Sequence, residues 1–144
     1  MVNSAKKGNL ANAGLVLEGN KMIASAESWV ISSHNPTAHS ERMLVERVCF
    51  DKHTNFTPGL DMVSIIEPCI MCISACSQAG YKTINYIIPA KKYLSKIPWM
   101  SDTAVIDKLL LARQLSNPLE LIHLVKYEQE FSRVYEKAMS HLLK

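Results

Sequence analysis

Two short fragments, well separated along the chain, constrain this protein more than any other feature. The first is His39-Ser40-Glu41 and the second is Pro68-Cys69-Ile70-Met71-Cys72. One imidazole and two thiolates are ligands that zinc prefers, and three protein ligands leave the fourth tetrahedral position open for water. Glu41 adds a carboxylate that can move protons without being a ligand. The fragments therefore predict a catalytic zinc site with His39, Cys69 and Cys72 as its ligands.

A closed structural zinc site is the alternative, and it needs a fourth protein ligand. The candidates are His34, His53, Cys49 and Cys76, none of which has ligand spacing with another. The proline before Cys69 and the order of the two fragments favour the catalytic site. Because no secretory signal begins the chain, Cys49 and Cys76 are expected to be buried thiols rather than a disulfide.

Both fragments are predicted to begin helices. Asn35 is expected as an N-cap with Pro36 at the first helical position, in a helix over 36–49. Pro68 is expected to open a second helix, which ends near Gly80.

The spacing of the ligands constrains where a metal can lie. Cys69 and Cys72, three residues apart, share one face of a helical first turn, whereas His39 and Glu41, two residues apart, do not. A metal bound by His39, Cys69 and Cys72, with Glu41 close by, must therefore lie near the N-terminal ends of the two helices. There, free N–H groups and the positive end of the helix dipole favour thiolates.

The rest of the pattern is that of an α/β domain. Apolar runs predict strands over 13–17, 22–28, 62–66, 83–88 and 119–125, and two further helices are predicted over 102–115 and 128–143. Gly19-Asn20 between the first two strands is a hairpin signal. Strands alternating with helices predict a three-layer α/β/α sandwich, with a mostly parallel sheet and one antiparallel hairpin at its edge. The last helix is expected to pack through one apolar stripe: Phe131, Val134, Tyr135, Ala138, Met139 and Leu142.

Composition is that of an ordinary soluble protein. The 144 residues are 48% hydrophobic and 20% charged, with a formal net charge of +3, and are expected to form a single domain over 1–144. No stretch approaches the ~18 consecutive apolar residues of a transmembrane helix. With no secretory signal either, the protein is expected to be cytoplasmic and to have no membrane partner.

Longer stretches around the two fragments resemble a known family. Residues 35–41 (N-P-T-A-H-S-E) and 66–72 (I-E-P-C-I-M-C) are similar to motifs of the cytidine/deoxycytidylate deaminase superfamily of zinc-dependent nucleobase and nucleoside deaminases. They are most similar to the branch of guanine deaminases, yeast-type cytosine deaminases and bacterial tRNA-adenosine deaminases. The resemblance implies a cytidine deaminase-like fold, in which a five-stranded mixed sheet carries helices on both faces. It also implies zinc on the three ligands named above, Glu41 as proton shuttle, and a dimer or higher oligomer.

The chain departs from the pattern of this family in three places. Members usually begin with a helix packed on the sheet, and residues 1–10 have no adequate helical stripe, so this helix is expected to be missing. Ser28 stands where an Asn commonly contacts the substrate, and residues 10–13 replace a segment of small residues and proline. Asp102 lies where guanine deaminases carry an acidic residue facing the substrate. Ser28 and Asp102 are therefore candidate substrate contacts, and a homodimer is expected to cover the exposed sheet face.

The leading hypothesis is a zinc-dependent hydrolytic deaminase of a free purine or pyrimidine base or nucleoside, similar to guanine deaminases. Zinc hydroxide would attack the amine-bearing ring carbon, while Glu41 carries the protons. The alternative is a tRNA-adenosine deaminase, with phosphate contacts from Lys91, Lys92 and Lys96. The modest net charge makes tRNA the less favoured partner. A deaminase-fold protein that binds zinc without turnover is a third hypothesis, against which the intact Glu41 argues.

Overall fold

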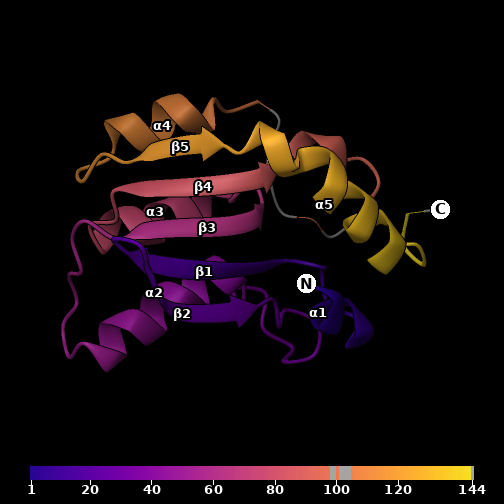
Figure 1. Cartoon of the computed structure of the whole chain (residues 1–144), viewed down its shortest axis with the longest axis horizontal. Coiled ribbons are helices and arrows are strands. Elements are labelled where there is room, and N and C mark those ends of the chain that lie inside the picture. The colour runs from indigo at the N-terminus through magenta and orange to yellow at the C-terminus, as the bar shows by residue number, and fades with distance from the viewer. Residues whose placement is uncertain (98–99, 101–104, 144) are drawn as a thin grey trace.

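One five-stranded sheet organises the chain, of which the computed structural model describes residues 1–97, 100 and 105–143 (Figure 1). Its strands lie in the order β2-β1-β3-β4-β5, where β1 is Ala13–Glu18, β2 Lys21–Glu27, β3 Asp61–Ile66, β4 Thr83–Ile88 and β5 Glu120–His123. Strand β1 pairs antiparallel with both β2 and β3, whereas β3, β4 and β5 are mutually parallel. The predicted mixed sheet with an antiparallel edge hairpin is confirmed.

The hairpin forms where the sequence predicts it. Glu18 pairs with Lys21 across the two-residue turn Gly19-Asn20, and Gly19 has a φ of 59°. A left-handed conformation at this position suits glycine, which has no Cβ to clash with the backbone.

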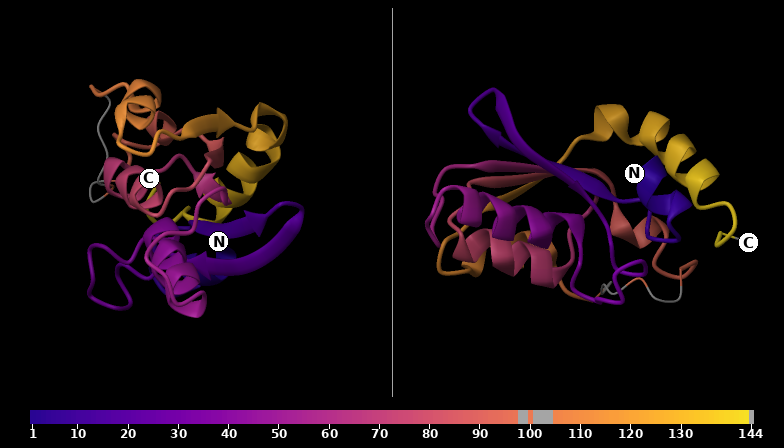
Figure 2. Two further views of the ribbon diagram at one scale, coloured as in Figure 1. Left: turned by 90° about the vertical axis from the view of Figure 1, so that its left-hand side faces the viewer. Right: turned by 90° about the horizontal axis from the view of Figure 1, so that it is seen from below.

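Helices cover both faces of the sheet, so the three-layer α/β/α architecture is also confirmed (Figure 2). Helices α2 (Ser40–Asp51), α3 (Ile70–Gln78) and α4 (Lys108–Gln114) lie on one face, and α1 (Val2–Lys6) and α5 (Val125–Ala138) lie on the other. A short 3₁₀ helix, η1 (Ala90–Lys92), follows β4. A core cluster that includes Val16, Leu44 and Ile84 packs under the first group, and one that includes Tyr135 and Met139 packs under the second. Within the described residues, no helix has the length and apolar character needed to cross a membrane.

The helix boundaries differ from the predictions at the two fragments. Helix α2 begins at Ser40 rather than Pro36, because the Asn35 side chain closes a tight turn, accepting hydrogen bonds from the Thr37 N–H and hydroxyl at 2.9 Å each. Helix α3 likewise begins at Ile70, two residues after Pro68.

Smaller differences occur in the C-terminal half. Helix α4 spans only residues 108–114 of the predicted 102–115, of which 101–104 lie outside the described part of the chain. Asp107 caps it through a 3.0 Å hydrogen bond from the Leu110 N–H. Helix α5 starts three residues earlier than predicted, and Val134 of its stripe is exposed rather than in the core.

A short helix stands at the start of the chain, where none was predicted. Helix α1 has five residues and packs against α5, and its Ser4 hydroxyl lies 2.8 Å from both the Leu10 and Ser28 carbonyl oxygens. Tertiary contacts stabilise this helix, since five residues are too few for an isolated helix to persist in water. The expectation of no helix in this segment was wrong, although the helix is short.

Candidate metal centre and adjoining cavity

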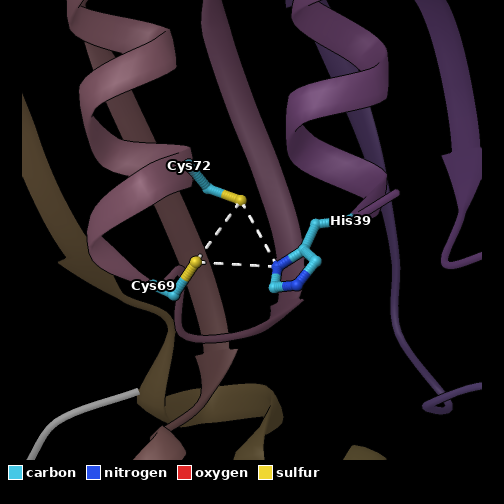
Figure 3. A group of neighbouring side chains, drawn as sticks. All are labelled: His39, Cys69 and Cys72. Atoms are coloured by element: carbon cyan, nitrogen blue, oxygen red, sulfur yellow. Dashed lines mark hydrogen bonds between the residues drawn. The ribbon is translucent and has the colours of Figure 1, made fainter. Parts of the chain in front are cut away.

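The three predicted ligands converge at the starts of two neighbouring helices (Figure 3). His39 is the N-cap residue of α2, Cys69 is the N-cap residue of α3, and Cys72 lies in the first turn of α3. The His39 Nδ1 atom lies 3.6 Å from the Cys69 Sγ and 3.7 Å from the Cys72 Sγ, and the two sulfurs are 3.7 Å apart. The expectation of a cluster between two helix N-termini is met, although each helix starts later than predicted.

These distances are those of a tetrahedral zinc site. Zinc–sulfur bonds of about 2.3 Å and zinc–nitrogen bonds of about 2.0–2.1 Å separate two sulfurs by about 3.8 Å and a sulfur from a nitrogen by about 3.6 Å. Both separations agree with those observed. Within the described residues, no fourth His, Cys, Asp or Glu completes the group. The residues present therefore fit a zinc ion with one position left open.

The two other cysteines do not join the metal cluster. Cys76 is fully buried in the core cluster beneath α2 and α3, and Cys49 packs against the same cluster. Both are free thiols, as the sequence predicts, although Cys49 is only partly buried. Burial raises the pKa of Cys76 far above its ordinary value, so this thiol stays protonated and unreactive.

Without metal, the ligands share their protons unequally. Hydrogen bonding from Cys72, together with that from His39, lowers the pKa of Cys69 to about 4. The same contact with Cys69, followed by burial, raises the pKa of Cys72. The bond to Cys69 raises the pKa of His39. One thiolate and one thiol are therefore favoured in the metal-free protein, and zinc uptake must displace the proton on Cys72.

Glu41 lies beside the cluster but is not part of it. Its side chain is only 2% exposed, and its two oxygens face different neighbours. The Oε1 atom accepts hydrogen bonds from Asn12 Nδ2 at 3.0 Å and from Ser64 Oγ at 2.5 Å. The Oε2 atom lies 3.1 Å from the Ser40 hydroxyl and 3.8 Å from the Cys72 sulfur. A buried carboxylate thus lies within reach of the metal ligands without serving as one.

A cavity of about 230 Å³ opens over these groups. Its lining includes His39, Cys69 and Glu41 together with Ser28, and the remainder is mainly apolar. The structure therefore brings Ser28 to the same cavity as the metal ligands. Asp102, the other candidate substrate contact, lies outside the described residues.

A buried ion pair supports the turn that carries Cys69. The Lys108 ammonium lies 3.0 Å from Glu67 Oε1 and donates to the Pro68 carbonyl oxygen at 3.1 Å. The second oxygen of Glu67 accepts the Ala90 N–H at 2.9 Å. These bonds tie the turn between β3 and α3 to α4 and η1, and so hold the N-terminus of α3 in place.

Sequence reasoning missed the partners of Glu41 and Glu67. Ser64 carries a recognisable signal, since it is a polar residue inside the apolar strand M-V-S-I-I. Asn12 stands just before a strand, where polar residues are common, and Lys108 stands at the first position of a helix, next to Asp107. Nothing local distinguishes these two from surface residues.

Comparison with known proteins agrees with this geometry. Residues 1–88 match the family described as the cytidine and deoxycytidylate deaminase zinc-binding region. The chain is 28% identical over 88 residues to a tRNA-specific adenosine deaminase of Aquifex aeolicus. That alignment covers 61% of this chain and 58% of the relative, so it spans little more than half of the relative's length.

Solved structures share the fold at low sequence identity. One, from a study of tRNA:A34 deaminases that edit A to I at the wobble position, has a TM-score of 0.75 at 17% identity, covering 92% of this chain and 90% of that one. The guanine deaminase of Nitrosomonas europaea also has a TM-score of 0.75, at 12% identity, covering 90% of this chain and 72% of that one. Since the family match extends over more than half of its residues, the chain belongs to the family that carries the cytidine and deoxycytidylate deaminase zinc-binding region, and zinc is its cofactor.

Proposed function

We propose that the protein is a hydrolytic deaminase that replaces the exocyclic amine of a purine or pyrimidine ring with oxygen. The observation that carries this proposal is the buried Glu41 carboxylate, placed beside a three-ligand metal cluster. His39 and Cys69 of this cluster line the same cavity as Glu41. A structural zinc site needs neither an open position nor a neighbouring carboxylate. When bound, zinc lowers the pKa of a water molecule and so supplies a nucleophile at neutral pH.

The side chains of the site divide the work between them. His39, Cys69 and Cys72 hold the metal, and the apolar part of the cavity keeps bulk water from the ring. Glu41 takes a proton from water and delivers it to the ring nitrogen beside the amine-bearing carbon. It then takes the remaining proton from the hydroxyl on that carbon and gives it to the amine, so that the carbon–nitrogen bond breaks, a carbonyl forms and ammonia leaves.

A free base or nucleoside is the substrate that we favour. The cavity of about 230 Å³ is smaller than the ~300–1,000 Å³ pockets of drug-sized ligands, and suits a single ring system. Ser28 offers a short hydroxyl at this cavity, which can donate or accept one hydrogen bond to the ring edge.

tRNA is the alternative substrate, and the names of the relatives support it. Two tRNA-specific adenosine deaminases match the chain, and one of the similar folds comes from a study of tRNA:A34 deaminases. A flipped adenosine needs no larger cavity than a free base. Phosphates would then meet basic residues outside the cavity, among which the cluster of Lys91, Lys92 and Lys96 is the candidate.

We also propose that the protein works as a cytoplasmic homodimer. Its four cysteines are free, as expected in a reducing compartment. Large apolar side chains are exposed at the edge strand and on α2, namely Met22 (56%) and Phe50 (77%). Burial of such side chains is a common reason for self-association. Light scattering that shows a monomer at micromolar concentration would count against the dimer.

The decisive experiment measures ammonia release from a panel of substrates. Zinc-loaded protein is incubated with guanine, cytosine, cytidine, adenosine and unmodified tRNA, with Glu41→Gln as the matched control. Glutamine keeps the shape of glutamate but cannot shuttle protons, so the variant should lose turnover while it keeps its zinc and its fold. Release from a free base or nucleoside supports the favoured substrate, and inosine formed only in tRNA supports the alternative. No release from any substrate, with one zinc bound per chain, would overturn the enzymatic proposal.

A further inference from the structure

The two oxygens of the Glu41 carboxylate are held differently, and the difference indicates a division of roles. The donors to Oε1 are Asn12, directly before β1, and Ser64, within β3, whereas Oε2 faces the Cys72 sulfur. We propose that Asn12 and Ser64 are positioning residues that anchor Glu41 through Oε1 and leave Oε2 as the oxygen that carries protons. This inference rests on the proposed function, in which Glu41 moves protons.

The direction of the Asn12 amide is determined by the backbone. Its Oδ1 atom accepts the Ile66 N–H at 3.1 Å and the Ala13 N–H at 3.0 Å. Two N–H donors can face only the oxygen of an amide, so the NH₂ group must point to Glu41. Asn12 is 5% exposed, which leaves this amide little freedom to turn away. It therefore links the start of β1, the end of β3 and the carboxylate.

Ser64 completes the anchor from β3. Its side chain is fully buried, and its Oγ atom lies 2.5 Å from Glu41 Oε1 and 2.8 Å from the Ile66 carbonyl oxygen. A hydroxyl has one hydrogen and can donate to only one of these acceptors. The shorter distance and the charge of the carboxylate favour donation to Glu41.

The two oxygens of Glu41 differ in how many of their lone pairs accept hydrogen bonds from Asn12, Ser64 and Ser40. Each carboxylate oxygen accepts about two hydrogen bonds. Asn12 and Ser64 fill both positions on Oε1, whereas Ser40, at 3.1 Å, fills one position on Oε2. The other lone pair of Oε2 faces Cys72, whose S–H donates to it at 3.8 Å without metal and loses this hydrogen when the thiolate binds zinc. A proton that arrives from water therefore meets Oε2, and the anchor keeps this oxygen in the same place through the reaction.

A purely structural role is the competing explanation, since a buried carboxylate needs hydrogen-bond donors whatever it does. Four variants separate the two explanations. Ser64→Ala removes one donor. Asn12→Asp keeps the oxygen that serves both N–H groups but replaces the donor to Glu41 with a second carboxylate, which repels Glu41. Ser64→Thr keeps the hydroxyl. The matched control is Ser77→Ala, because Ser77 is also buried and donates at 2.9 Å to the Asn117 carbonyl oxygen, away from Glu41.

The kinetic arm uses whichever substrate of the panel the wild-type protein deaminates. Because a small misplacement of a catalytic group costs much of its rate, we expect kcat to fall about tenfold in Ser64→Ala and about tenfold or more in Asn12→Asp. KM and zinc content should stay near wild type. Ser64→Thr should restore most of kcat, and Ser77→Ala should leave kcat unchanged while lowering stability to a similar degree. Equal kcat values in Ser64→Ala and Ser77→Ala would overturn the proposal.

The structural arm needs no substrate, so it separates this inference from the proposed function. Crystal structures of zinc-loaded wild type and Asn12→Asp/Ser64→Ala are compared at the Glu41 carboxylate. We expect the carboxylate to move by about 1 Å or to occupy several rotamers once both donors are gone. If it keeps its wild-type position, the anchor does not exist. If it moves but wild type deaminates nothing in the panel, the anchor stands and the proposed function fails.

Discussion

Removal of the Lys108 ammonium tests how the turn before Cys69 is held. Lys108 is 7% exposed and Glu67 is 15% exposed, so the change Lys108→Met leaves a carboxylate in a nearly closed site without its closest cation. Removing one member of a buried ion pair costs about 3–5 kcal/mol of stability, because the remaining charged group stays buried without a group of opposite charge. At roughly 3 °C per kcal/mol for a chain of this size, the melting temperature should fall by about 9–15 °C.

The assays are urea unfolding and thermal melting of zinc-loaded protein, both followed by far-UV circular dichroism, with metal concentration held constant. The double variant Lys108→Met/Glu67→Gln should be more stable than Lys108→Met alone, because glutamine removes the stranded charge and can still accept the Ala90 N–H.

The matched control for this prediction is Arg113→Met, on the same helix. Arg113 pairs with Glu120 at 2.9 Å, close to the distance in the buried pair, but both side chains are about half exposed. Solvent screens such a pair, so the unfolding midpoint of this variant should hardly change. Equal midpoints for Lys108→Met and Arg113→Met would refute the reasoning, since burial would then make no difference.

Three further predictions concern metal, backbone and thiols. Metal analysis should give about one zinc per chain, and a chelator should lower the melting temperature, because zinc binds only the folded site. Gly80→Ala should destabilise the protein by about 1–3 kcal/mol, since the residue has a φ of 82° and a Cβ there would lie 2.5 Å from the Phe56 ring. In contrast, Gly19→Ala, at a φ of 59° with open space around it, should cost less in the same denaturation assay. Iodoacetamide at pH 8 should leave Cys76 of native zinc-loaded protein unmodified, as mass spectrometry can show, because burial raises the pKa of this thiol and excludes the reagent.

The sequence correctly predicted that two helices begin near the metal ligands, but it placed the first residue of each helix too early. Asn35 and Pro36 have the composition of a helix start, yet the side chain of Asn35 closes a turn and α2 begins after His39. Both patterns use the same residue types, because an Asn that accepts a hydrogen bond from an N–H two residues ahead can precede a helix or a turn. Because both helices begin later than predicted, His39 and Cys69 are their N-cap residues. Two of the three ligands therefore occupy the same position relative to their helices.

Helix α1 and the anchor of Glu41 were not predicted, for a common physical reason. Five residues have no helical stability of their own, so α1 depends on its contact with α5 at the opposite end of the chain. Asn12 and Ser64 reach Glu41 from 29 and 23 residues away. Their roles depend on which strand neighbours which, and no local pattern carries that information.

The sequence by itself determined the chemistry that this chain can support. Ligand types and spacing predicted a zinc site with His39, Cys69 and Cys72, and the alternation of strands and helices predicted the three-layer fold. These features are local, because ligand preference and backbone periodicity are properties of neighbouring residues. Only the tertiary structure decided how the site is held, since pairing β1 with β3 is what brings Asn12 and Ser64 to one oxygen of Glu41. Hydrogen bonds act over about 3 Å, so a residue's partner is known only when distant segments have been packed together.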